Sequence, residues 1–304
     1  MRTSLECLGC MINQAIRAAQ VTSGDRDVQQ RIVRHALAET VHVDFASQPV
    51  TAGRRVQRLG RPLTGNHDPY RGLKQRSTAL ALRLLPELRR KVLASPMPIG
   101  AALSVATAAN ALDFAMYADL DERAVRRALA HAAAQPIDGA LALAAEAATA
   151  REILYIADNA GELVFDGLVI DLLDRARVTL AVRGGPIFND ATLHDARVSR
   201  LTDTVLVIDT GSDLAGVVLD ECSDDFRRHF ASADLVIAKG QGNYETLDDV
   251  EGPIWFALKV KCPVIARAIG VAEGQCVLQR QTAVAGGPDR GERRQPVRAP
   301  LHAR

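Results

Sequence analysis

The second half of the chain alternates between short runs of β-branched, apolar residues and segments that resemble helices or loops. This alternation starts near residue 150 and is typical of a parallel sheet whose strands are joined by crossover helices. The predicted strands are Glu152–Ala157, Val178–Val182, Val205–Ile208, Leu235–Ala238 and Val264–Ala266. No other arrangement accounts as simply for strands separated by amphipathic segments, so we expect an α/β domain over residues 151–278.

The first half of the chain has a different pattern, because almost all of it repeats apolar residues at helical spacing. The predicted helices are Leu8–Ala19, Val28–Thr40, Leu73–Ala94, Ile99–Tyr117, Glu122–Ala134 and Leu141–Ala148. A turn-rich break, Gly60–Asp68, separates two of them. The last stretch, Gln279–Arg304, is mostly Arg, Gly, Pro and Gln without an apolar period, which predicts a disordered tail. We therefore expect three parts, residues 1–150, 151–278 and 279–304.

Composition narrows the class of protein. The 304 residues are 48% hydrophobic and 24% charged, which suits a soluble globular chain with a sizeable core. A net charge of +1 and only 4% aromatic residues give no reason to expect a nucleic acid or an acidic membrane surface as partner. The five cysteines are odd in number and unevenly spaced, unlike a secreted disulfide framework, and no signal peptide is recognisable, so we expect a cytoplasmic protein.

Four of the predicted strands are followed by unusual polar and glycine-rich segments. These segments are "ADNAGE" (157–162), "VRGGPIFNDAT" (182–192), "IDTGSD" (208–213) and "AKGQGNYE" (238–245). The carboxyl ends of parallel strands meet at the same edge of a sheet, where open α/β sheets bind their ligands. The four segments therefore predict one shared pocket.

The residue types in these segments suit a hard cation and a phosphate. Asp158, Asn159 and Asp190 offer the oxygen ligands that Mg²⁺ and Mn²⁺ prefer. Lys239 and Arg183 could neutralise charge on a phosphoryl group, and the glycines let backbone amides approach an anion. Each segment taken alone could be a helix cap or an ordinary turn. The coincidence of four such segments favours metal-assisted phosphoryl chemistry.

Seven segments together resemble the damage-control phosphatase family over nearly the whole chain except the tail. They are "ECLGC" (6–10), "TGNHDPY" (64–70) with Lys74, "AANALDF" (108–114), "DNAGE" (158–162), "RGGPIFNDAT" (183–192), "KGQGNYETL" (239–247) and "LKVKCPVIARAIG" (258–270). The resemblance implies a helical N-terminal domain packed on a Rossmann-like α/β/α domain with a mainly parallel sheet. It also implies a metal-dependent phosphatase acting on small phosphate esters, with sugar phosphates as a typical class.

The resemblance also implies roles for individual residues. Asp158, Asn159 and Asp190 would bind the metal, which is Mn²⁺, Co²⁺, Ni²⁺ or Mg²⁺. Glu162, Lys239 and Gly240 would contact the substrate, and we add Arg183, Asn110 and Asp113 to the predicted substrate side. The residues predicted to take part in catalysis are Asp158, Asp190 and Lys239. The expected partner is a small phosphorylated metabolite.

Two pairs of polar residues in the first half have two interpretations each. Asn110 and Asp113 lie three residues apart on one face of an apolar helix, so they either face the pocket or bond to a neighbouring helix. Asp68 and Lys74 either close the pocket or form a pair at the surface.

The motif Cys7-x-x-Cys10 is open to three interpretations. It is a partial metal site completed by another group, a redox pair, or two buried apolar thiols on one helical turn. A second pair at similar spacing is absent, so the sequence does not support a four-cysteine zinc site.

The sequence favours hydrolysis of a small phosphomonoester, by attack of either metal-bound water or the Asp158 carboxylate. Two other functions are compatible with the same residues. One is a non-catalytic protein that binds a metal and a phosphate ligand. The other is a metal-handling protein centred on Cys7 and Cys10.

Overall fold

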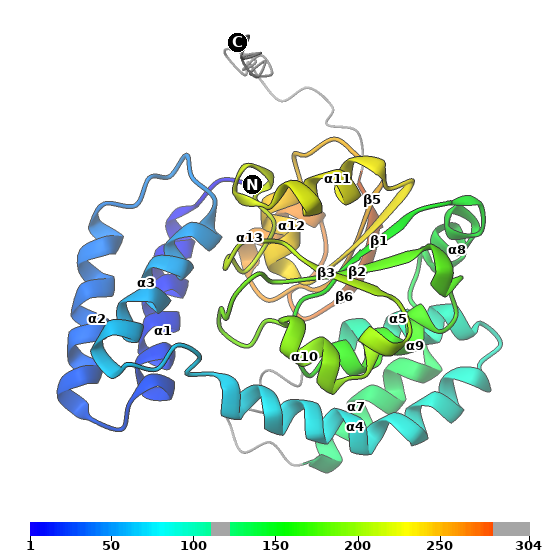
Figure 1. The fold of residues 1–304 in the computed structure, drawn as a ribbon, viewed down its shortest axis with the longest axis horizontal. Coiled ribbons are helices and arrows are strands. Elements are labelled where there is room, and N and C mark those ends of the chain that lie inside the picture. Colours follow the sequence, from blue (N-terminus) through cyan, green and yellow to red (C-terminus); the bar gives the residue numbers. More distant parts are fainter. Residues whose placement is uncertain (111–121, 282–304) are drawn as a thin grey trace, which may run out of the picture.

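A computed structural model describes residues 1–110 and 122–281, and its centre is a six-stranded sheet (Figure 1). The strand order is β3-β2-β1-β4-β5-β6. The strands are β1 (Ile153–Ile156), β2 (Val178–Val182), β3 (Leu206–Asp209), β4 (Leu235–Lys239), β5 (Ile254–Lys259) and β6 (Cys276–Arg280). The first five strands are parallel and β6 runs antiparallel to β5. The predicted α/β class with a mainly parallel, Rossmann-like sheet is confirmed.

Helices cover both faces of the sheet. On one face lie α4 (Arg71–Leu93), α5 (Pro98–Ala108), α7 (Glu122–Ala134), α8 (Ala140–Thr149), α9 (Leu163–Ile170) and α10 (Leu193–Val198). On the other lie α11 (Asp224–Ser232), α12 (Gln241–Leu247) and α13 (Pro263–Ile269). Short 3₁₀ turns lie at η1 (Arg175–Arg177), η2 (Leu201–Asp203) and η3 (Leu219–Glu221).

The alternation of side chains along β1 explains why its sequence is apolar throughout. Ile153 and Tyr155 belong to the core that includes α4, α5 and α7–α9. Leu154 and Ile156 belong to the core under α11–α13. A parallel strand buried on both faces needs an apolar residue at every position, not at every second one.

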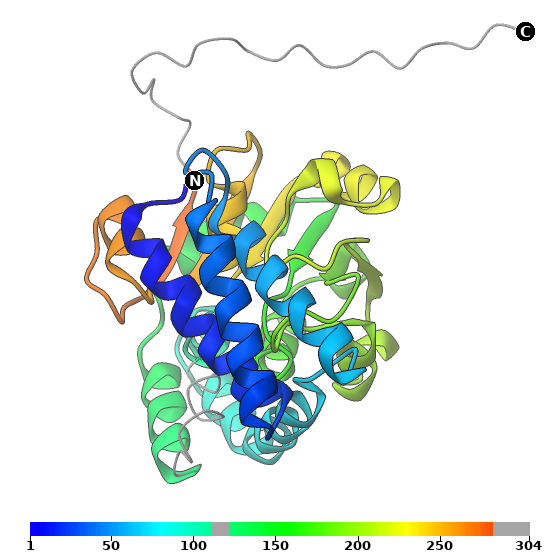
Figure 2. The same cartoon turned by 90° about the vertical axis from the view of Figure 1, so that its left-hand side faces the viewer.

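Three further helices form a separate layer at one side of the sheet. They are α1 (Leu5–Thr22), α2 (Arg26–Val41) and α3 (Pro49–Thr64), and Figure 2 shows them side by side. In contrast, α4, α5, α7 and α8 share one core with the strands. The change of sequence pattern near residue 150 therefore marks where strands begin along the chain. Residues from both sides of this point contribute to one core.

Two predictions for the C-terminal part are wrong. The predicted strand Val264–Ala266 lies within α13, which starts with Pro263 at its first position and ends before Gly270. Proline at the start and glycine after the end are helix signals that outweigh the β-branched residues between them. The predicted tail begins too early, because Gln279 and Arg280 belong to β6 and pair with β5.

Two predictions for the helical part differ from the structure, and one predicted site residue lies outside the described residues. Helix α3 was not predicted, and it extends to Thr64, through half of the expected break at Gly60–Asp68. The predicted helix Ile99–Tyr117 is helical to Ala108, and Asp113 lies outside the described residues. None of the described helices is both long and apolar enough to cross a membrane.

Candidate active site

The predicted site residues lie at the carboxyl edge of the sheet, where the strand order changes direction. Strand β1 pairs with β2 on one side and with β4 on the other, so crossover connections leave this point in opposite directions. Asp158 and Asn159 follow β1, while Lys239 ends β4 and Gly240 follows it. This is the position at which open α/β sheets bind ligands.

The loop after β2 folds back across the end of β1. The amide of Ala191 donates to the Asp158 carbonyl at 2.7 Å. In return, the amide of Ala160 donates to the Asn189 carbonyl at 2.9 Å. Asn159 and Asp190 form an isolated β-bridge. Two loops that are separate in sequence therefore present Asp158, Asn159 and Asp190 together, as the sequence predicts.

Arg183 joins the two carboxylates. Its guanidinium is 1% exposed, and Nε donates to Asp190 Oδ2 at 2.8 Å. Nη1 donates to Asn243 Oδ1 at 2.9 Å, and Nη2 lies 3.6 Å from Asp158 Oδ1. Arg183 is thus held between the predicted metal ligands, and Asn243, a buried residue of α12 that was not among the predicted site residues, fixes its other side.

Two buried amides and a carboxylate complete this part of the site. Asn159 Nδ2 donates to Asp158 Oδ2 at 3.0 Å and reaches Glu162 Oε2 at 3.5 Å. Asn110 Nδ2 donates to Glu162 Oε2 at 3.1 Å and lies 3.4 Å from Asp158 Oδ2. The structure therefore places Asn110 against the site carboxylates Asp158 and Glu162. Its Oδ1 atom is buried and has no hydrogen-bond partner among the described residues.

Lys239 lies beneath these groups and is fully buried. Its ammonium contacts the Glu162 carboxylate, Asp166 Oδ1 at 2.7 Å and the Ala106 carbonyl at 3.2 Å. The Tyr155 hydroxyl donates to the same Asp166 oxygen at 2.7 Å. Asp166 was not among the predicted site residues, although a charged residue inside the apolar helix "LVFDGLVI" was a signal that could have identified it.

Burial and crowding raise the pKa of the carboxyl groups at this edge. The pKa of Asp158 rises well above its usual value through burial and through the negative charges of Asp190 and Glu162. Burial also raises the pKa of Asp190, against the opposing effect of Arg183, and raises the pKa of Asp166 to about 6. These directions mean that the site favours an additional positive charge or bound protons.

Two lysines contribute positive charge near these carboxyl groups. Burial works to lower the pKa of Lys239, but Asp166 and Glu162 outweigh it and raise this pKa above its ordinary value. Lys261, in the loop before α13, is close enough to lower the pKa of both Asp158 and Asp190. Lys261 was not singled out from the sequence, because its proximity depends on the return of the chain after β5.

The buried charges suit a divalent cation. Among the residues that the structure describes, the buried acidic side chains are Asp158, Glu162, Asp166, Asp190 and Asp195. The buried basic ones are Lys74, Arg183 and Lys239. The fully buried carboxylates thus outnumber the fully buried cations by two, an acidic excess that Lys261 and bound protons reduce, and Asn110 Oδ1 is a further oxygen ligand nearby.

The donor set is of the hard, oxygen type. In the described part of the chain, no three or more His, Cys, Asp and Glu side chains form a group that could hold a metal ion by themselves. A cation at this edge would therefore use the two carboxylates of Asp158 and Asp190, the amide oxygen of Asn159 and water, which fits Mg²⁺ or Mn²⁺.

Lys74 ties the helical part to the loop after β2. Its side chain is 2% exposed and lies 3.2 Å from Asp68 Oδ2 and 3.1 Å from Asp195 Oδ2. Asp195 also accepts from the amide and hydroxyl of Thr192, at the start of α10. Lys74 is thus buried, and the half-buried Asp68 pairs with it rather than with solvent at an open surface.

Cys7 and Cys10 lie on the first turns of α1. Cys7 Sγ is 3.4 Å from the Ser4 hydroxyl, and Cys10 is exposed, so the interpretation of two buried thiols is wrong for Cys10. Partial burial, then Cys262 and Cys7, raise the pKa of Cys10. Cys262, which precedes α13, is thus a third thiol near the pair. The metal-site and redox interpretations stay predictions.

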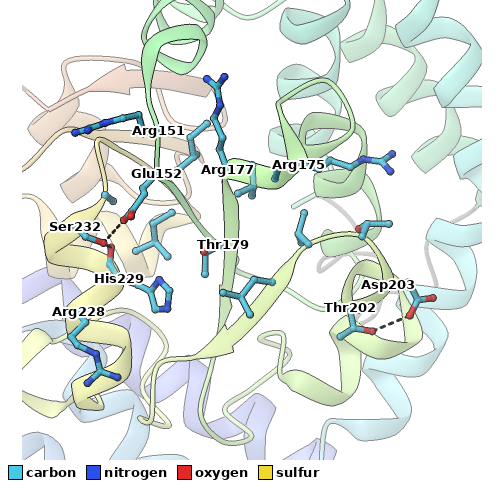
Figure 3. A pocket seen from close by; sticks show the side chains of 18 residues that line it. Arg151, Glu152, Arg175, Arg177, Thr179, Thr202, Asp203, Arg228, His229 and Ser232 are labelled. Atoms are coloured by element: carbon cyan, nitrogen blue, oxygen red, sulfur yellow. Dashed lines mark hydrogen bonds between the residues drawn. The ribbon is translucent and has the colours of Figure 1, made fainter.

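A hollow of about 880 Å³ lies at the opposite, amino edge of the sheet (Figure 3). Its lining residues include Arg151, Arg175, Arg177, Arg228 and His229. No predicted site residue lines it.

The chain is similar to known proteins over most of its length. The sequence matches the damage-control phosphatase ARMT1-like domain over residues 3–277. It is 34% identical to an uncharacterized protein, MJ0202, of Methanocaldococcus jannaschii, over 91% of this chain and 94% of that one. It is also 34% identical to the damage-control phosphatase PH1575 of Pyrococcus horikoshii, over 92% of this chain and 98% of that one.

A solved structure extends the comparison to the fold. The crystal structure of the DUF89 family protein PH1575 from Pyrococcus horikoshii superposes with a TM-score of 0.85 at 31% identity. The superposition covers 93% of this chain and 100% of the PH1575 chain. Sequence and fold agree, and the chain belongs to the ARMT1-like damage-control phosphatase family.

Proposed function

We propose that this protein is a divalent-metal-dependent phosphatase that hydrolyses small phosphomonoesters, such as sugar phosphates or damaged phosphorylated metabolites. Family membership supports phosphatase activity on damaged metabolites. The observation that carries the metal dependence is the buried acidic excess at the carboxyl edge, where the pKa of Asp158 is raised by burial, Asp190 and Glu162. A bound divalent cation would neutralise that excess.

In this proposal Asp158, Asn159 and Asp190 hold the metal, which is Mn²⁺, Co²⁺, Ni²⁺ or Mg²⁺. When bound, the metal supplies Lewis-acid polarisation of a phosphoryl oxygen. Arg183 holds Asp190 in place through the 2.8 Å contact and balances part of the negative charge. Glycine at position 240 leaves room for the Asp158 carboxylate, because a Cβ there would lie 2.0 Å from its Oδ2.

The expected partner is a small phosphorylated metabolite rather than a nucleic acid or a membrane, and the expected location is the cytoplasm. A net charge of +1 and 4% aromatic residues support the choice of a small metabolite over a nucleic acid or a membrane.

The test is phosphate release from a panel of sugar phosphates, using full-length protein stripped of metal and then supplied with Mn²⁺, Co²⁺, Ni²⁺ or Mg²⁺. We expect metal-dependent release by the wild type and a loss of about 10²-fold or more in Asp158→Asn and Asp190→Asn. Asparagine keeps the size of each side chain and removes its charge. No release with any metal, from protein shown to be folded, would favour a non-catalytic metal- and phosphate-binding protein.

A further inference from the structure

The ammonium group of Lys239 has no donor left for a substrate in the described structure. A lysine ammonium offers three N–H donors. Lys239 Nζ contacts three acceptors, which are the Glu162 carboxylate, Asp166 Oδ1 and the Ala106 carbonyl. The side chain is also fully buried. The resemblance to the family predicts that Lys239 contacts the substrate. In the structure, however, all three N–H groups of its ammonium have acceptors within the protein.

The acceptor that faces the site, Glu162, is held at both of its oxygens. One oxygen contacts Lys239, and Oε2 accepts from Asn110 at 3.1 Å and from Asn159 at 3.5 Å. Asn159 Nδ2 therefore points toward the Glu162 and Asp158 carboxylates. An amide whose nitrogen is fixed in this way presents its oxygen elsewhere, as a metal-binding amide must.

Lys239, Glu162, Asp166 and Tyr155 form a connected hydrogen-bond network, and its far end is anchored on α9 and β1. Asp166, on α9, accepts from both Lys239 and the Tyr155 hydroxyl, which projects from β1. Asp166 and Tyr155 are both fully buried. A carboxylate and an ammonium buried this deeply are costly to desolvate, and the tyrosine and the Ala106 carbonyl supply the extra hydrogen bonds that such a pair needs.

We propose that Lys239, Asp166 and Tyr155 are positioning residues, which act through Glu162 to orient the Asn159 amide toward a bound divalent cation. Lys239 in this arrangement does not contact the substrate phosphate. The inference rests on the proposed function, because it assigns a role at the same metal site. Outer contacts of this kind commonly change metal affinity 10- to 100-fold when they are removed.

The experiment measures Mn²⁺ affinity by calorimetry on full-length, chelator-treated protein. The variants are Asp166→Asn, which removes one charge of the network, and Tyr155→Phe, which removes a single hydroxyl and keeps the ring. Ser104→Ala is the matched control, because Ser104 is buried on α5 and bonds to the Gln135 carbonyl at 2.7 Å, outside the network. Circular dichroism and thermal unfolding establish that each variant is folded.

A second readout separates positioning from substrate contact. Inorganic phosphate serves as the probe, and its affinity is measured on each variant at saturating Mn²⁺. We expect Mn²⁺ binding to weaken about 10- to 100-fold in Asp166→Asn, and less in Tyr155→Phe, with Ser104→Ala within about twofold of the wild type. The affinity for phosphate in the Mn²⁺-saturated variants should change less than about twofold.

Two results would overturn the inference. One is unchanged Mn²⁺ affinity in both network variants, whatever happens to phosphate. The other is weakened phosphate binding by the Mn²⁺-saturated Asp166→Asn variant at unchanged Mn²⁺ affinity, which would make Lys239 a phosphate ligand. A wild-type protein that binds no Mn²⁺ is a different failure, because it contradicts the metal site of the proposed function and the inference falls with it.

Discussion

The two edges of the central sheet differ in whether their charged side chains are buried or exposed. At the carboxyl edge the charged side chains are buried, with five carboxylates against three cations among the described residues. At the amino edge, around the hollow in Figure 3, the arginines are exposed and paired with nearby aspartates. These pairs are Arg175–Asp171 at 2.6 Å, Arg177–Asp174 at 2.9 Å and Arg228–Asp225 at 2.8 Å.

The comparison shows that the size of a hollow is a poor guide to function in this molecule. Exposed ion pairs contribute about 0–1 kcal/mol each and are common on any protein surface. Buried charges cost several kcal/mol to desolvate and are retained chiefly where they are paired or used. The buried, unbalanced charge at the carboxyl edge is therefore a stronger sign of a binding site than the 880 Å³ hollow at the amino edge.

The largest effect is expected from Gly240→Ala. Gly240 has φ +81°, and a Cβ there would lie 2.0 Å from Asp158 Oδ2. The substitution combines backbone strain with a clash against a proposed metal ligand, so we expect a loss of about 2–6 kcal/mol in the free energy of unfolding and loss of metal-dependent turnover. Urea unfolding and phosphate release measure the two effects.

Gly270→Ala is the matched control for that substitution. Gly270 has a similar φ of +83°, but nothing lies within 4 Å of a Cβ at this position. Its loss of stability should be about 1–3 kcal/mol, from the backbone alone, and turnover should persist. Equal effects of the two substitutions on turnover would remove the argument that position 240 is shaped around Asp158.

An intermediate effect is expected from pH on metal-free protein. The pKa of Asp166 is about 6 in the folded chain, against an ordinary value of 3.8, so the folded state binds its proton more tightly than the unfolded state. Stability should therefore rise by about 1 kcal/mol from this group as pH falls from about 7 to 5, and the full gain of about 3 kcal/mol is reached only below pH 3.8. Urea unfolding in chelator at several pH values measures this slope.

Asp166→Asn should reduce that pH dependence, because one titrating group is gone, while the raised pKa values of Asp158 and Asp190 keep part of the slope. If the wild type and Asp166→Asn show the same slope between pH 5 and 7, Asp166 does not contribute to the acid response of the protein.

The smallest effect is expected at the amino edge. Arg228→Ala removes an arginine that lines the hollow and pairs with Asp225 on the surface of α11. We expect the free energy of unfolding to change by less than about 0.5 kcal/mol, with turnover unaffected. A loss of turnover in this folded variant would contradict the comparison and give the hollow a role.

The three strands that position the site, β1, β2 and β4, were predictable from sequence because each is a short apolar run followed by a polar turn. Strand β5 was missed, since "IWFALK" has no polar turn after it, and the neighbouring "PVIARAI" was taken as a strand although proline and glycine delimit a helix there. Strand β6 was missed because it is a half-exposed edge strand with little apolar character.

The site residues were predicted where a side chain follows a strand directly, as with Asp158 and Lys239. The residues that hold them were not. Asp166 and Asn243 lie within helices, and Lys261 approaches the site only because the chain returns after β5. Such contacts depend on which helices pack together, and local patterns in a sequence carry little information about that.

The unbalanced buried charge has a consequence for the lifetime of the protein in a cell. An ion that binds the folded chain alone adds about 2.7 kcal/mol of stability at a concentration of 100 times its dissociation constant. A chain with an excess of buried carboxylates would then be most vulnerable to proteolysis whenever that ion is scarce. The abundance of the protein would follow the supply of the metal, without any dedicated sensor.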